Sequence, residues 1–390
     1  MHNTFCCILV AKMKKEEQNP FPVSGYHGSE LFCDREEETR VLTSNALNGI
    51  NTVLLSVRRM GKTGLLHHVL AHMNKKKIAI GIYIDIFDTE SLHDFINRLT
   101  SAMIQAVPPR THFSKLVMEF IKQLRPIISY DELTGQPQVT ITYSQTKQYE
   151  HTLQSIFSFL ESQGKDIVIA IDEFQQIAQY PEKNMEAILR THIQNLKNIK
   201  FIFSGSSPHL LAQMFHNTKR PFFSSASTLA LQEIEVQEYK KFIINIFNSR
   251  KRKISDEAID FILMFSKCHT FYTQALCNKL FADGERNITI ENVQKAAYDL
   301  MKQNEAVYFQ YRTMLTTNQW DMLKATAKET VLYQPTSKAI VKKYGLGSSS
   351  VVQRSMEALL EKEMIYIKET KVGVGYCVYD CFLSRWLERY

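Results

Sequence analysis

The sequence is poor in the features that mark specialised classes of protein. It has 14 glycines and 10 prolines in 390 residues, which excludes a collagen-like or low-complexity chain and favours a helix-rich one. Its longest apolar runs, residues 5–11 and 167–171, fall far short of the roughly 18 residues that a membrane span requires. The net charge is only +7, an excess that permits a polyanionic partner without requiring one.

The seven cysteines follow no recognisable framework. Their number is odd and no C-x-x-C pair occurs, which argues against a zinc site or a disulfide scaffold. This pattern is typical of a reducing compartment, so we expect a cytoplasmic protein. Hydrophobic residues make up 44% and charged residues 22%, as in ordinary globular proteins, and the length predicts two or three domains.

Residues 1–24 are predicted to form a disordered leader. The lysines follow the short apolar patch of residues 5–11, whereas a signal peptide has its positive charges first and a longer apolar core. Met13 opens a polar stretch of the kind that begins many proteins. Residues 1–12 are therefore either a mis-assigned start or part of the leader.

The most informative stretch is residues 51–70. A short apolar run at 52–55 is followed by Ser56-Val57-Arg58-Arg59-Met60-Gly61-Lys62-Thr63 and then by a helical pattern from Gly64. Strand, loop and helix are the context that a G-x-x-x-x-G-K-[ST] phosphate-binding loop requires. Lys62 would reach the β- and γ-phosphates and Thr63 would bind Mg²⁺. Ser56 replaces the usual first glycine, and the alternative interpretation is a chance Gly-Lys-Thr at a helix start.

A second motif lies about 110 residues downstream, where the apolar run 167–171 ends in Asp172-Glu173. Such a run predicts a strand buried on both faces of a parallel sheet, and open α/β sheets bind ligands at the carboxyl ends of their strands. Asp172 would belong to the Mg²⁺ shell and Glu173 would polarise the attacking water. The alternative is a helix N-cap followed by an acidic first turn.

Two further apolar stretches complete the predicted sheet. Residues 200–207 form a strand that ends in Ser-Gly-Ser-Ser, where Ser204 could sense the γ-phosphate or orient water; the alternative is an ordinary Gly-Ser turn. Residues 78–87 form another strand, which ends near Asp85. Strands that alternate with helices predict an α/β fold with a doubly wound parallel sheet. No N-K-x-D guanine-reading motif occurs, so ATP is favoured over GTP.

These motifs resemble the P-loop ATPases of the AAA+/STAND group, and specifically the archaeal and bacterial ATPases with a GPRRxGKT-like loop. The match comprises residues 56–63, 172–175 and 204–207, together with an upstream F-x-x-R-E-x-E-like box at residues 32–38. The resemblance implies that the segment around Arg35 lies beside the adenine. The cofactor-binding residues expected from the loop and the box are Ser56, Arg58, Arg59, Met60, Gly61, Lys62, Thr63, Gly64 and Arg35. Lys62, Glu173 and Ser204 are the expected catalytic residues.

The chain departs from this family pattern in two places. Where relatives often carry P-L-Y-G-R, this sequence has Arg220-Pro221-Phe222-Phe223-Ser224-Ser225, so an arginine finger is missing from its usual slot and Arg220 is a weak substitute. Residues 267–274 keep an aromatic run but lack the G-G-x-P segment of the family's helical lid. The contacts between lid and nucleotide therefore cannot be carried over.

The predicted organisation is an ATPase domain at residues 25–230 with a hairpin insertion at about 126–145, a helical lid at 231–305 and a winged helix-turn-helix at 306–390. The last segment shows three helices followed by a strand-turn-strand, which is the winged-helix order. It holds 12 Lys and Arg against 8 Asp and Glu, without a strongly basic recognition face. DNA binding and protein contact both remain open for it.

Two functions follow from the sequence. The first is a Mg²⁺-dependent ATP-binding protein that hydrolyses ATP to switch the orientation of the lid and the winged helix. The alternative is a nucleotide-gated DNA-binding regulator with slow or no hydrolysis, which Ser56 and the missing arginine favour. The expected partners are ATP and either DNA or a protein, with no membrane; an oligomer is compatible with the sequence.

Overall fold

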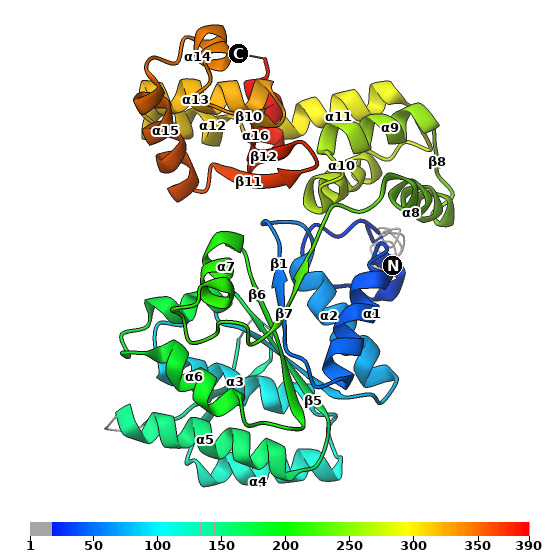
Figure 1. The fold of residues 1–390 in the computed structure, drawn as a ribbon. Helices are drawn as coiled ribbons and strands as arrows, with labels where there is room; N and C mark the ends of the chain where they lie inside the picture. The colour runs from blue at the N-terminus through cyan, green and yellow to red at the C-terminus, as the bar shows by residue number, and fades with distance from the viewer. Residues whose placement is uncertain (1–17, 133, 143–145, 390) are drawn as a thin grey trace, which may run out of the picture.

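The computed structural model describes residues 18–132, 134–142 and 146–389. Figure 1 shows a lower lobe built around a central sheet and an upper, largely helical lobe, joined by the segment that follows strand β7. Of the leader predicted for residues 1–24, residues 1–17 lie outside the described residues. Residues 18–24 pack on the upper lobe, where Phe21 is fully buried with its ring 4.7 Å from that of Phe247.

The lower lobe contains a five-stranded sheet in the order β2-β5-β6-β1-β7, and all its paired strands are parallel. Its strands are β1 (Thr52–Leu55), β2 (Ile80–Asp85), β5 (Ile167–Asp172), β6 (Ile199–Gly205) and β7 (Ser227–Ala230). This arrangement confirms the predicted parallel sheet. Because β6 lies between β1 and β5, the phosphate loop and the Asp-Glu pair are separated by one strand, whose polar end lies between them.

Helices cover both faces of this sheet, as alternation within the strands requires. Every residue of β5 is buried: Ile169 belongs to the apolar core on one face and Val168 to that on the other. The second face is covered by α1 (Glu36–Leu47) and α2 (Lys62–Lys75), seen on the right of the sheet in Figure 1. The first is covered by α3 (Leu92–Ala106), α4 (His112–Gln123), α5 (Thr146–Ser162), α6 (Met185–Ile193) and α7 (Pro208–His216).

Smaller elements complete the lower lobe. Strands β3 (Ile127–Tyr130) and β4 (Pro137–Thr140) form an antiparallel hairpin between α4 and α5. The hairpin is fixed to α3 because the Val139 N–H donates to the Ser101 hydroxyl at 2.9 Å. Two 3₁₀ helices, η1 (Ser29–Leu31) and η2 (Phe174–Gln179), precede α1 and follow β5.

The upper lobe begins with a group of helices that we call the lid. These are α8 (Val236–Ser249), α9 (Asp256–Ser266), α10 (Thr270–Ala282) and α11 (Ile290–Gln303), and α12 (Glu305–Met314) connects them to the rest of the upper lobe. The structure adds a parallel pair of two-residue strands, β8 (Lys253–Ile254) and β9 (Asn287–Ile288). The sequence shows only a helical pattern here because two residues are too few to display the period of a strand.

The remainder of the upper lobe, which we call the winged helix, has four helices and a three-stranded β wing in its described residues. It comprises α13 (Thr317–Lys328), β10 (Leu332–Tyr333), α14 (Lys338–Tyr344), α15 (Ser349–Glu361), β11 (Ile365–Thr370), β12 (Gly373–Val378) and α16 (Cys381–Leu387). Gly373 and Gly375 lie within β12. Glycine at position 375 leaves room for the segment at β10, because a Cβ on residue 375 would lie 2.4 Å from Val331 Cγ1.

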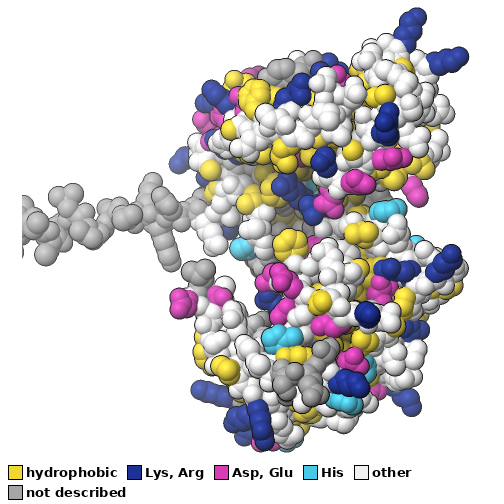
Figure 2. All heavy atoms as spheres, turned by 90° about the vertical axis from the view of Figure 1, so that its left-hand side faces the viewer, with side chains coloured by type: hydrophobic (Ala, Val, Ile, Leu, Met, Phe, Trp, Pro, Cys, Tyr) yellow, Lys and Arg dark blue, Asp and Glu magenta, His cyan; other side chains and the backbone are white. Residues whose placement is uncertain are grey.

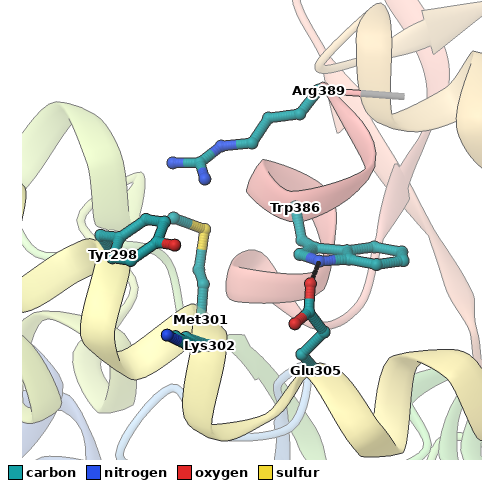
Figure 3. A pocket seen from close by; sticks show the side chains of 6 residues that line it. All are labelled: Tyr298, Met301, Lys302, Glu305, Trp386 and Arg389. Atoms are coloured by element: carbon teal, nitrogen blue, oxygen red, sulfur yellow. Dashed lines mark hydrogen bonds between the residues drawn. The ribbon is translucent and has the colours of Figure 1, made fainter.

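The winged helix is attached to the lid through α16. Figure 3 shows Trp386 of α16 donating its indole N–H to Glu305 Oε1 at 3.1 Å. The Arg389 guanidinium lies 5.6 Å from the ring centre of Tyr298 in α11. These residues line a pocket of about 180 Å³ between α11, α12 and α16. The lid and the winged helix also share one apolar core, so their contact is extensive.

Among the described helices, none combines the length and apolarity needed to cross a membrane. The five cysteines in the described part of the chain are all free: Cys33, Cys268, Cys277, Cys377 and Cys381.

Candidate functional site

The sequence motifs meet at the carboxyl edge of the sheet. The phosphate loop, residues 56–63, follows β1, the Asp172-Glu173 pair ends β5, and residues 204–206 end β6. The lid and the winged helix face this edge from above (Figure 1). Open α/β sheets place their ligands at this position, so the fold brings together the residues that the sequence singles out.

The backbone of the phosphate loop shows why a serine can stand at its first position. Positive φ angles occur at Arg59 (66°) and Gly61 (88°), whereas Ser56 is not among the described residues with positive φ. A serine at the first position of the loop therefore requires no left-handed backbone. Gly61 precedes α2, whose first N–H groups have no partner within the helix and point toward the space in front of the loop. Such a helix start favours an anion.

Lys62 and Thr63 lie in direct contact with the acidic pair. The Thr63 hydroxyl donates to Asp172 Oδ2 at 2.7 Å. The Lys62 ammonium lies 3.6 Å from Asp172 Oδ1 and 3.4 Å from Glu173 Oε1. The side chains of Lys62 and Asp172 are only 8% and 2% exposed, so their charges are largely removed from water. The two carboxylates stabilise the buried ammonium, because a buried charge without a partner would cost free energy.

Glu173 is held in an unusual conformation. Its φ of 59° places a non-glycine residue in the left-handed region, a local strain that concentrates at functional sites. Its Oε2 accepts hydrogen bonds from the Ser206 N–H at 3.1 Å, the Ser206 hydroxyl at 2.8 Å and Gln175 Nε2 at 2.6 Å. Burial opposes ionisation, but Lys62 and these donors outweigh it, so the pKa of Glu173 is lowered from its ordinary value. The group is a carboxylate at neutral pH.

The structure brings Ser206, two residues beyond the predicted Ser204, to Glu173. Ser204 is fully buried within β6, and its Oγ has no hydrogen-bond partner among the described residues. Gly205 between them allows Gln175 to approach, because a Cβ at this position would lie 1.9 Å from Gln175 Oε1. Ser206 and Gln175 belong to the same sequence motifs as Ser204 and Glu173, but only the turn geometry shows which side chain reaches the carboxylate.

Two residues at the end of β2 were not singled out as site residues. The Tyr83 hydroxyl donates to Asp172 Oδ2 at 3.3 Å, and burial followed by the charge of Asp172 raises the pKa of this phenol. Asp85 pairs in register with Asp172 in the sheet. Burial raises the pKa of Asp85, and Asp172 and Glu173 add to that effect while the Phe87 N–H opposes it. The periodicity of β2 predicts its strand but not which hydroxyl reaches the neighbouring strand.

Arg35 lies against the phosphate loop. It is 4% exposed, its Nη1 is 2.7 Å from Glu38 Oε1, and its Nη2 donates to the Met60 carbonyl at 3.5 Å. Phe32 in the same segment stacks on His68 of α2, with ring centres 4.4 Å apart, and its ring would lie 3.4 Å from a Cβ at Gly64. The upstream box therefore packs beside the start of α2.

The lid touches the phosphate loop although it lacks the glycines and proline expected from the family pattern. The Thr270 hydroxyl donates to the Met60 carbonyl at 2.9 Å, and the Phe271 N–H donates to the Arg59 carbonyl at 3.1 Å. The Arg59 guanidinium donates to the Tyr272 hydroxyl at 2.8 Å and lies 4.6 Å from the ring centre of Phe271. The aromatic run 271–272 thus holds one of the two loop arginines.

His269 is buried at this junction between loop and lid. It is 7% exposed, and neither ring nitrogen has a hydrogen-bond partner among the described residues. Burial lowers the pKa of His269 to about 4, although the charge of Glu233 opposes the shift. The imidazole is therefore neutral at physiological pH, and protonating it would place a positive charge near Arg59 and Lys368, both of which also disfavour it.

His269 should make the folded protein sensitive to acid. Its folded-state pKa is below the unfolded value near 6.5, so the unfolded state binds more protons and stability is lost as the pH falls from 6.5 to about 4. The loss attributable to this residue reaches at most about 3 kcal/mol. Denaturant unfolding of the wild type, His269→Gln and the exposed-site control His112→Gln between pH 7 and 4 measures it. Parallel pH profiles for wild type and His269→Gln would contradict the assignment.

Arg220, the weak substitute for an arginine finger, is paired with a carboxylate of the lower lobe. Arg220 forms an ion pair with Glu186 of α6, whose side chain is 10% exposed. Burial raises the pKa of Glu186 while Arg220 lowers it. In this arrangement Arg220 is tied to α6 and is not directed to the Lys62–Asp172 pair.

The winged helix presents a mixed surface. The exposed residues of α14 and α15 include Lys338, Lys342 and Arg354, but also Glu357 and Glu361. Figure 2, which views the molecule from the left of Figure 1, shows basic and acidic side chains interspersed over this face. Other basic residues are paired: Lys343 with Glu329 and Lys368 with Glu233 of the linker to the lid. No single-sign field dominates the face shown.

The sequence and the structure are both similar to known proteins. A family model described as an ATPase domain predominantly from Archaea matches residues 32–266, and one described as a probable winged helix domain matches residues 306–389. A Walker-type ATPase of Pyrococcus abyssi superposes with a TM-score of 0.67 at 17% sequence identity, covering 95% of this chain and 100% of that chain. The ORC2 protein of Aeropyrum pernix, in ADPNP–ADP complexes, gives 0.58 at 13% identity, with 96% of each chain covered. No curated protein matches the sequence significantly. At these identities the structural likeness shows the fold.

Proposed function

Because the chain belongs to the family of ATPase domains found predominantly in Archaea, we propose that it binds ATP with Mg²⁺ and hydrolyses it to switch the lid and the winged helix. Family membership supports nucleotide binding. The observation that carries the proposal is the convergence of Lys62, Thr63, Asp172 and Glu173 at one edge of the sheet, with Thr63 Oγ1 only 2.7 Å from Asp172 Oδ2.

The donor set at this edge fits a hard divalent cation. Thr63 and Asp172 contribute a hydroxyl and a carboxylate oxygen, which are ligands that Mg²⁺ prefers when it also binds substrate phosphates. The described residues contain no cluster of three or more His, Cys, Asp or Glu that could hold a metal without such help. Thr63 and Asp172 would therefore hold the ion, and Mg²⁺ supplies charge neutralisation at the phosphates when bound.

The remaining polar groups have distinct proposed tasks. Lys62 would exchange its carboxylate partners for β- and γ-phosphate oxygens. Its positive charge and its position at the start of α2 suit it to this contact. Glu173, ionised at neutral pH, would accept a hydrogen bond from the attacking water and align it. Ser204, at the end of β6, is retained as a proposed sensor of the γ-phosphate.

Other residues of the loop and its surroundings are proposed to contact the nucleotide. Arg35 would lie on the adenine side. The proposed loop contacts are Ser56, Arg58, Arg59, Met60, Gly61, Lys62, Thr63 and Gly64. The division into an ATPase domain, a lid and a winged helix near residues 230 and 305 is proposed with them, as are a cytoplasmic location and an oligomeric assembly that could supply an arginine.

Metal dependence provides the test of this function. Phosphate release from ATP should require Mg²⁺ and stop in EDTA. Asp172→Asn should raise the Mg²⁺ concentration that gives half-maximal rate about tenfold or more, because a charged ligand is lost. Asp166→Asn, at the exposed opposite end of the same strand, serves as the control. Equal Mg²⁺ dependence in all three proteins, or turnover in EDTA, would contradict the metal assignment.

A nucleotide-gated DNA-binding regulator is the second candidate. The winged-helix match and the exposed Lys338, Lys342 and Arg354 of α14 and α15 favour it. Anisotropy of a labelled duplex, measured between 50 and 200 mM salt with and without ATP, should then show affinity that falls with salt. Lys342→Ala should weaken that binding, whereas Val372→Ala at the tip of the wing should not. Absence of binding at low salt would favour a protein partner.

A further inference from the structure

The winged helix inserts a tyrosine between two parts of the candidate site. Tyr379 follows β12, and its ring packs against Tyr366 of β11 with centres 5.2 Å apart. The Tyr379 hydroxyl accepts a hydrogen bond from the backbone N–H of Arg58 at 3.0 Å and donates one to the Ser206 carbonyl at 3.2 Å. One hydroxyl of the upper lobe therefore connects the phosphate loop with the end of β6.

Several charged contacts hold the winged helix in this position. The Arg58 guanidinium lies 2.8 Å from Glu363, and that of Arg59 lies 3.3 Å from Asp380, the residue after Tyr379. Lys368 of β11 pairs with Glu233. Because the Arg58 and Arg59 side chains bind the upper lobe, the paired arginines of the loop act here as anchors for the winged helix.

The contact reaches Glu173 through a single residue. Ser206 offers its carbonyl to Tyr379, while its N–H and hydroxyl both donate to Glu173 Oε2. Gln175 donates to the same oxygen, and Lys62 lies beside the other. The carboxylate is thus surrounded by protein donors. In this arrangement three protein donors fill Oε2, so that oxygen cannot align a water, and the Arg58 N–H is not free to bind a phosphate oxygen.

We propose that Tyr379 is a positioning residue through which the docked winged helix restrains the phosphate loop and Glu173. Its hydroxyl fixes Ser206, which in turn keeps Glu173 Oε2 bonded to the protein, and it occupies an N–H of the phosphate loop. When ATP, or a partner bound to the exposed face of the winged helix, displaces this domain, Glu173 and the Arg58 N–H are released. The inference rests on the proposed ATPase function and adds the means by which it is controlled.

Tyr379→Phe tests the restraint, because it removes the hydroxyl and keeps the ring. Loss of two neutral hydrogen bonds that exist only in the restrained state should raise kcat about 3- to 10-fold, while the same loss lowers the thermal midpoint by no more than a few degrees. Tyr366→Phe is the matched control, since its ring lies in the same sheet and contacts Tyr379 without any hydrogen bond from its hydroxyl to the phosphate loop among the described contacts. An unchanged or lower kcat in Tyr379→Phe would overturn the proposal.

Amide exchange without nucleotide separates this proposal from the proposed function. The Arg58 amide should exchange several-fold faster in Tyr379→Phe than in the wild type or Tyr366→Phe, because its acceptor is gone. Equal exchange in the three full-length proteins would overturn the restraint, whatever the rate of ATP turnover. If none of the three hydrolyses ATP, the proposed function fails, while faster exchange in Tyr379→Phe would still establish the contact between the winged helix and the loop.

Discussion

Lys62→Ala is expected to lower ATP affinity about 100-fold or more. The ammonium lies at the start of α2 between Asp172 and Glu173, and it is the basic side chain closest to the acidic pair in the described site. Removing one partner of a desolvated, charge-assisted contact costs about 2–5 kcal/mol, and about 2.8 kcal/mol corresponds to 100-fold. Titration with a fluorescent ATP analogue in Mg²⁺ measures the loss.

Loss of this lysine also affects the protein without nucleotide. Asp172 is 2% exposed, and without Lys62 it faces Glu173 with no neutralising charge, so some loss of stability is expected. Lys75→Ala, at the exposed far end of the same helix, controls for general effects on α2. A folded Lys62→Ala protein that binds ATP as tightly as Lys75→Ala would show that the phosphates bind elsewhere.

Glu173→Gln is expected to keep ATP binding and to lower turnover about 100-fold or more, the range that general-base assistance contributes. The amide has the same shape and can still accept hydrogen bonds from Ser206, so the fold should persist. The pKa of Glu173 is lowered from its ordinary value, so the group is a carboxylate throughout the range from pH 8 to pH 6. Titration of Glu173 should therefore not lower the wild-type rate in this range. Phosphate release and nucleotide titration measure the two effects.

Glu90→Gln, at an exposed position after β2, is the control for this substitution. If Glu173→Gln hydrolyses ATP at the wild-type rate, then another group aligns the water and the base assignment is wrong. If the variant loses affinity and rate together, Glu173 contributes to binding before it contributes to chemistry.

Much of the lower lobe could be predicted from local patterns. The apolar run of β5 and the strand-loop-helix around Gly61 are each recognisable over a few consecutive residues. The sequence therefore predicts the parallel sheet and the polar residues at its carboxyl edge. The pairing of β6 with β5 follows less directly, because local patterns predict strands but not the order in which they pair. Ser56 replaces the first glycine of the loop motif, but its backbone does not have the positive φ that would favour glycine at this position.

The contacts between distant segments could not be predicted. Tyr379 and Arg58 are 321 residues apart, and no periodicity or motif in a single sequence joins them. Trp386 is buried in the core of the upper lobe, as an aromatic residue there is expected to be, but nothing in the sequence shows where the Tyr379 hydroxyl lies. Likewise, the choice of Ser206 over Ser204 depends on a turn whose geometry is set by Gly205 and Gln175 together.

The most direct test of the central claim is the nucleotide product formed by the purified full-length chain. The protein is incubated with ATP in Mg²⁺ or in EDTA, and ADP and phosphate are quantified alongside Lys62→Ala and Lys75→Ala. The proposed ATPase predicts equal amounts of ADP and phosphate in Mg²⁺ from the wild type and Lys75→Ala, and neither product in EDTA or from Lys62→Ala. Product formation that persists in Lys62→Ala or in EDTA, or no product from the wild type in Mg²⁺, would contradict it.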